Sequence, residues 1–92
     1  MRVAAIIERK LTEALAPTRL RVIDDSKLHA GHAGARPQGE THFRVEIVAA
    51  CFEGLSRIAR QRRVHDVLAE ELAGPVHALA LSLRTPAEDG SA

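Results

Sequence analysis

The sequence predicts an α+β domain in which a three-stranded sheet carries helices packed on one face. The first observation behind this is the order of elements along the chain, which is helix, strand, strand, helix, strand. The second is the alternation of apolar and polar residues over 42–49, which is typical of a strand with one buried face. The third is the length of 92 residues, which fits one domain. We expect this domain to cover residues 1–86 and a flexible tail to cover 87–92.

The first half of the chain predicts a helix, a strand and a long loop. Residues 3–16 place apolar side chains at helical spacing, and Pro17 ends that pattern. Residues 19–24 alternate as a short strand does. Residues 26–41 are polar and rich in glycine, so they predict a loop of the kind that is usually functional or mobile.

The second half predicts a strand, a helix and a last strand. The strand over 42–49 is followed by a turn, and Ser56 is a suitable N-cap for a helix that extends to about Leu72, in one piece or in a short and a longer one. The residues expected on its buried side are Ile58, Val64, Val67, Leu68 and Leu72. Gly74 and Pro75 end this helix, and residues 76–83 alternate as the third strand.

Composition excludes several classes of protein. The formal charge is +1, from 13 basic and 12 acidic residues, so no polyanionic partner is demanded. The lone Cys51 permits no internal disulfide, which suits a reducing cytoplasm, and it cannot supply an all-thiolate cluster site. No phosphate-binding glycine loop, zinc-protease motif or CxxC pair is present, so an enzyme is disfavoured. No apolar run is long enough for a membrane span.

The five histidines are the unusual feature. His29 and His32 lie in the glycine-bearing loop, and His77 opens the third predicted strand. Imidazole is a good ligand for zinc, iron and copper, so a loop histidine and a strand histidine could supply two metal ligands and leave the others to a partner. The alternative is that these side chains are solvated or hydrogen-bonded, which spacing alone favours.

Four arginines gather near the start of the second predicted helix. They are Arg57, Arg60, Arg62 and Arg63. One interpretation is a patch that contacts phosphates or an acidic partner. The other is a solvated helix face, which the small net charge and the presence of only two aromatic residues favour.

Several motifs in order resemble the BolA family from about residue 5 to residue 86. They are Asp25-Ser26 before a histidine-bearing loop, Glu40-Thr41-His42-Phe43-Arg44-Val45, Phe52-Glu53-Gly54-Leu55-Ser56 leading to Arg60 and Arg62, Leu68-Ala69-Glu70-Glu71-Leu72, and Val76-His77-Ala78-Leu79-Ala80-Leu81. Two features depart from the family pattern. Gln61 stands between the two arginines where a histidine is usual, and no aromatic residue follows Thr85-Pro86.

The resemblance implies a fold like a class II KH domain, with the order α-β-β-α-(α)-β, and a non-enzymatic adaptor. It implies a partnership with monothiol, CGFS-type glutaredoxins in which a [2Fe–2S] cluster bridges the two proteins, in cluster trafficking and iron homeostasis. The glutaredoxin supplies a cysteine, and glutathione supplies a thiolate. This chain would supply His77 and a loop ligand, for which His29 is the best match by register and His32 is the alternative. No tightly bound cofactor is expected on the isolated chain.

The family also includes members described as transcriptional regulators, and KH-like folds can bind nucleic acid. A second hypothesis is therefore a DNA-binding regulator that contacts phosphates through residues 57–63.

Overall fold

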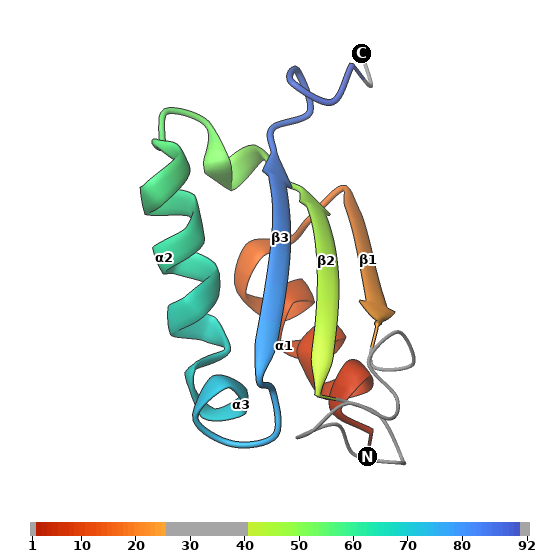
Figure 1. The fold of residues 1–92 in the computed structure, drawn as a ribbon. Coiled ribbons are helices and arrows are strands. Elements are labelled where there is room, and N and C mark those ends of the chain that lie inside the picture. The colour runs from red at the N-terminus through yellow and green to blue at the C-terminus, as the bar shows by residue number, and fades with distance from the viewer. Residues whose placement is uncertain (1, 26–40, 91–92) are drawn as a thin grey trace.

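A computed structural model describes residues 2–25 and 41–90 (Figure 1). Its elements are α1 (Val3–Leu15), β1 (Arg19–Asp24), β2 (His42–Val48), the 3₁₀ turn η2 (Ala50–Phe52), α2 (Arg57–Val67), α3 (Ala69–Ala73) and β3 (Ala78–Arg84). This order confirms the predicted α+β class, including the break in the second helix. Among the described residues, no helix is long and apolar enough to cross a membrane.

The sheet has the order β1-β2-β3, with β2 in the centre. Strands β1 and β2 pair in antiparallel fashion, whereas strands β2 and β3 pair in parallel fashion. Parallel neighbours need a long crossover, and the segment that contains α2 and α3 provides it. As a result β2 and β3 begin at the same end of the sheet, where His42 lies opposite Ala78.

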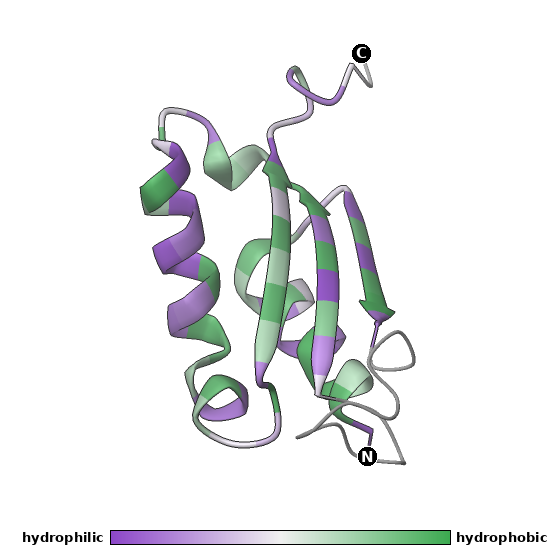
Figure 2. Ribbon diagram, in the orientation of Figure 1, coloured by the Kyte–Doolittle hydropathy of each residue, from purple (hydrophilic) through white to green (hydrophobic). Residues whose placement is uncertain are grey.

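One face of the sheet carries the core. Figure 2 shows β2 alternating between apolar and polar residues, and its members in the buried core cluster are Phe43, Val45 and Ile47. Helix α1 lies behind the sheet in Figure 1 and contributes Ile7, Leu11 and Leu15, which are buried in the same cluster. Burying one such side chain stabilises the fold by about 1.5–3 kcal/mol. The helices therefore pack on one face, as the sequence predicted.

The expectation that Ile58 belongs to the buried side of the second helix is wrong. Its side chain is 62% exposed, whereas Val64 and Leu68 are buried. Successive helical residues are 100° apart, so Ile58 lies about 120° around the helix from Val64. Arg60, one turn before Val64, faces inward instead and places its guanidinium over the ring of Phe52.

Candidate functional site

The backbone around His77 is held by two parts of the fold. On one side, the Glu71 carbonyl accepts hydrogen bonds from the N–H groups of Gly74 and Val76, at 3.2 and 2.9 Å. On the other side, the Thr41 carbonyl accepts from the N–H groups of His77 and Ala78, at 2.7 and 3.2 Å. The Val76 N–H therefore still bonds to a carbonyl of α3. The strand β3 begins at Ala78 rather than at residue 76 as predicted.

Glu71 also connects this turn to α1. Its buried carboxylate accepts hydrogen bonds from Lys10 Nζ at 2.9 and 3.0 Å, and Glu70 Oε1 lies 3.2 Å from the same atom. The hydrogen bond to Glu71 raises the pKa of Lys10 above its ordinary value. These contacts fix the segment that precedes His77, while the His77 residue itself is exposed.

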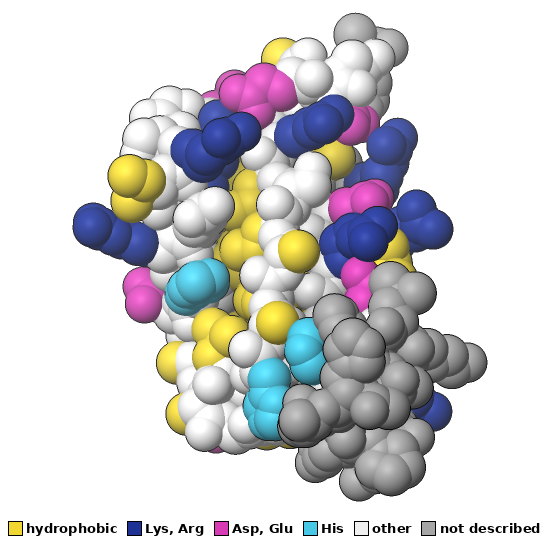
Figure 3. Space-filling view, in the orientation of Figure 1, with side chains coloured by type: hydrophobic (Ala, Val, Ile, Leu, Met, Phe, Trp, Pro, Cys, Tyr) yellow, Lys and Arg dark blue, Asp and Glu magenta, His cyan; other side chains and the backbone are white. Residues whose placement is uncertain are grey.

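His42 lies beside His77. The sequence pattern did not identify His42 as a candidate metal ligand. The two ring centroids are 6.3 Å apart, and the rings are inclined by 70°. His42 Nδ1 lies 2.8 Å from Oγ1 of the fully buried Thr41, which orients the His42 ring. Figure 3 shows histidine side chains gathered at this end of the sheet.

The missed signal is the parallel pairing of β2 and β3. His42 is the first residue of β2, and His77 immediately precedes β3. Two residues at the starts of neighbouring parallel strands meet at one edge of a sheet, although 35 positions separate them in the sequence. Knowledge of the strand order would have been enough to pair these histidines.

The predicted loop ligands His29 and His32 lie outside the described residues, so their part in a metal site stays a prediction. Across 2–25 and 41–90, no group of three histidine, cysteine, aspartate or glutamate residues is placed to hold a metal ion. What these ranges offer at the end of the sheet is a pair of imidazoles. This donor set fits a centre in which other molecules supply further ligands.

The four arginines divide into two groups. Arg57 and Arg60 line a cavity of about 670 Å³ between α2 and the end of β3. Arg62 and Arg63 do not line this cavity, and both are exposed. Two of the four arginines thus face the cavity and two face solvent, because neighbouring residues of a helix point in different directions, and their predicted contact with a partner or nucleic acid stays a prediction.

Of the four arginines, Arg60 makes the most side-chain hydrogen bonds to described residues. Its Nε donates to the Leu55 carbonyl at 3.1 Å, and its Nη1 donates to the Leu83 carbonyl at 3.2 Å. The two terminal nitrogens donate to the Glu88 carboxylate at 2.6 and 3.0 Å. The bond from Arg60, followed by one from the Thr85 N–H, lowers the pKa of Glu88 from its ordinary 4.5 to about 2, and the pKa of Arg60 is raised in turn.

The turn after β3 places Glu88 beside Arg60. Glu88 accepts a hydrogen bond from the Thr85 N–H at 3.0 Å, and the Thr85 hydroxyl accepts from the Glu88 N–H at 3.2 Å. This reciprocal pair has the pattern of a helix capping box. The prediction of a flexible tail over 87–92 concerns motion and stays a prediction.

Comparisons with known proteins agree with this architecture. A family model described as BolA-like protein matches residues 11–88. Human BolA-like protein 1 is 55% identical over 86 residues, which cover 94% of this chain and 60% of that protein. The DNA-binding transcriptional regulator BolA of Vibrio cholerae is 41% identical over 83 residues, which cover 90% of this chain and 74% of the regulator.

A solved structure matches over nearly the whole fold. The BolA domain of SufE1 from Arabidopsis thaliana superimposes with a TM-score of 0.82 at 42% identity, and the match covers 92% of this chain and 93% of that one. This chain spans 60–61% of the length of the BolA-like protein 1 sequences that it matches. Because the family model covers most of the chain and the fold agrees, the chain belongs to the BolA-like protein family.

Proposed function

We propose that this chain is a non-enzymatic cytoplasmic adaptor that binds a monothiol, CGFS-type glutaredoxin and co-ligates a bridging [2Fe–2S] cluster. Its role would be in iron–sulfur cluster trafficking and iron homeostasis. The observation that carries the proposal is the exposed His77 beside His42, on a backbone that the Thr41 carbonyl fixes. The family membership supports it, because the motif that contains His77 is part of the resemblance.

The donor set suits a shared cluster better than a metal site within one chain. Imidazole nitrogen is an established ligand of iron in [2Fe–2S] centres. Of the proposed ligands, the described residues contain His77, and the loop would add His29 or His32, so the cysteine of a glutaredoxin and the thiolate of glutathione would complete the set. When bound, the cluster would supply a one-electron redox centre whose potential is raised by histidine ligation.

The chain's own residues have distinct parts in this proposal. His77 is the direct ligand, and His29 or His32 is the second. Thr41 holds both the backbone of His77 and the ring of His42, so one buried residue positions the two imidazoles. The His42 ring lies edge-on to that of His77, with the ring centroids 6.3 Å apart. An imidazole side chain that is already ordered loses less rotamer entropy when it binds the cluster.

The proposal is tested by mixing this protein with a monothiol glutaredoxin, glutathione, iron and sulfide. We expect a heterodimer whose visible circular dichroism differs from that of the glutaredoxin homodimer. His77→Ala should change this spectrum, whereas His65→Ala on the exposed surface of α2 should leave it unchanged. No heterodimer, or a spectrum that both variants leave intact, would contradict the proposal.

A second candidate is a DNA-binding regulator, which the name of the Vibrio cholerae relative favours. Arg62 and Arg63 are exposed and would contact phosphates. Fluorescence anisotropy with duplex DNA at several salt concentrations tests this role, because each phosphate contact steepens the salt dependence. Binding that survives at physiological salt and weakens in Arg62→Gln and Arg63→Gln would support it. An absence of binding there would reject it.

A further inference from the structure

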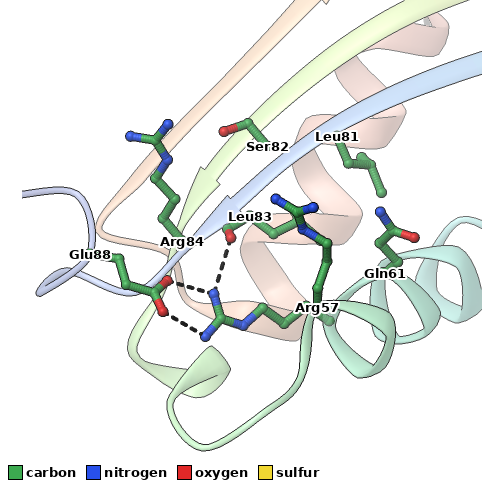
Figure 4. Close-up of a pocket in the computed structure, with 8 residues that line it drawn as sticks. Arg57, Gln61, Leu81, Ser82, Leu83, Arg84 and Glu88 are labelled. Atoms are coloured by element: carbon green, nitrogen blue, oxygen red, sulfur yellow. Dashed lines mark hydrogen bonds and ion pairs between the residues drawn. The ribbon is translucent and has the colours of Figure 1, made fainter.

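The cavity lined by Arg57 and Arg60 lies at the opposite end of β3 from His77. Its walls come from the first turns of α2 and the last residues of β3, and Leu81 and Leu83 lie between them (Figure 4). Figure 3 shows apolar side chains at the surface of the hollow between α2 and β3. The cavity therefore combines an apolar floor with a cationic rim.

A carboxylate already occupies part of this cavity. Glu88 makes two hydrogen bonds to the terminal nitrogens of Arg60 (Figure 4). The Arg60 side chain is only 11% exposed. It also donates hydrogen bonds to the carbonyls of Leu55 and Leu83. A guanidinium fixed in this way is a rigid receptor for a carboxylate, because it loses little side-chain entropy when it binds.

The cavity also has positive charge beyond what Glu88 balances. Its lining contains three arginines and one carboxylate, since Arg84 joins Arg57 and Arg60. Among the residues that the structure describes, the Arg57 side chain has no hydrogen bond or ion pair. The Nη1 atom of Arg84 is 3.9 Å from the nearest Asp89 carboxylate oxygen. The rim can therefore receive a further carboxylate beside the one that Arg60 holds.

The edge of β3 favours an extended peptide as the occupant. β3 is an edge strand of the described sheet, and its Leu83 carbonyl points into the cavity because it accepts from Arg60. Backbone groups of alternate residues face the same side of a strand, so those of Leu81 face the same hollow. Because the Leu83 carbonyl already accepts from Arg60, the outward backbone groups of Leu81 are the ones with which an added peptide strand would pair.

A single-stranded nucleic acid fits this cavity less well. Such ligands bind through aromatic side chains on which their bases stack. The chain has two phenylalanines, and both Phe43 and Phe52 are buried in the core.

We propose that this cavity binds an extended acidic segment of a partner protein, and that Glu88 is an internal occupant which the segment displaces from Arg60. The segment would lie along the β3 edge, with carboxylates toward Arg57, Arg60 and Arg84 and apolar side chains toward Leu81 and Leu83. Glu88, in the turn over residues 85–90, then competes with the partner segment for Arg60 and so sets the affinity of the cavity for that segment. This site is independent of the cluster proposed above, because it uses neither histidine.

Fluorescence anisotropy tests the proposal with a labelled eight-residue peptide in which aspartate and leucine alternate, and with its asparagine counterpart. We expect the intact protein to bind the aspartate peptide and not the asparagine peptide. Glu88→Gln should tighten binding on the order of threefold or more, because apparent affinity rises with the fraction of open sites. Arg57→Gln should weaken it about twofold to fivefold, which is the range of an exposed ion pair.

Arg63→Gln is the matched control, since it removes an exposed arginine of the same helix that does not line the cavity. It should leave the affinity unchanged, and circular dichroism should show all variants folded. Equal binding of the two peptides, or no tightening in Glu88→Gln, would overturn the proposal. Binding of a single-stranded oligonucleotide that responds to Glu88→Gln and Arg57→Gln, without binding of the aspartate peptide, would assign the cavity to nucleic acid and also overturn it.

Discussion

Replacing Thr41 by valine tests how the two histidines are held. Valine has nearly the shape of threonine, so the change removes the hydroxyl that lies 2.8 Å from His42 Nδ1 and leaves the packing of this fully buried residue. The backbone carbonyl that accepts from His77 and Ala78 remains. A hydrogen bond of this kind contributes about 0.5–1.5 kcal/mol to the free energy of unfolding.

For a domain of this size, a loss of about 1 kcal/mol lowers the melting temperature by roughly 4–8 °C. Thermal unfolding followed by circular dichroism measures this change. Thr18→Val is the matched control, because its hydroxyl donates to the Val48 carbonyl at 3.1 Å and the Thr18 N–H already donates to the same carbonyl at 2.8 Å. We expect the control to change stability by less than about 0.5 kcal/mol.

The site should respond as well as the stability. In Thr41→Val the NMR signals of the His42 and His77 imidazoles should both move, whereas those of the exposed His65 should stay. Equal melting temperatures for Thr41→Val and the wild type, with unmoved imidazole signals, would refute the view that Thr41 positions this pair.

Two further predictions concern the folded core and the carboxylate on Arg60. Leu68→Ala should lower the free energy of unfolding by about 2–5 kcal/mol, whereas Ile58→Ala should change it by less than about 0.5 kcal/mol, because only Leu68 is buried. Urea unfolding of both variants checks this, and equal losses would contradict the burial assigned to Leu68 and the exposure assigned to Ile58. The pKa of Glu88 is lowered to about 2 in the folded protein, so its contribution is present above its ordinary value of 4.5 and is lost as the pH falls toward 2. Stability of the wild type and Glu88→Gln should therefore converge between these pH values, and a constant difference across this range would show that Glu88 is not held as described.

The sequence predicted those parts of the fold that depend on local pattern. The alternation around Phe43 and Val45 identified β2, and Pro17 marked the region where α1 ends. Ser56 caps α2 as expected, since its hydroxyl accepts from the Ala59 N–H at 3.1 Å. In each case the signal lies within a few residues of the feature that it predicts.

The features that the sequence did not reveal depend on contacts between distant segments. Ile58 was assigned to the core because an apolar residue normally occupies the buried side of a helix. Arg60 takes that side instead, because Glu88 and the Leu83 carbonyl satisfy its charge and its donors. The pairing of His42 with His77 likewise required the parallel register of β2 and β3. Such partners cannot be identified before the topology is known.

The most direct test of the central claim asks whether nitrogen of His77 binds iron. This protein, labelled with ¹⁵N only at histidine, is assembled with unlabelled glutaredoxin, glutathione, iron and sulfide, and the reduced complex is studied by pulsed electron paramagnetic resonance. The account predicts ¹⁵N couplings from two directly bound imidazoles, of which His77→Ala removes one and His65→Ala removes neither. A cluster-containing complex with no ¹⁵N coupling, or with couplings that His77→Ala leaves unchanged, would contradict the assignment of His77 as a ligand.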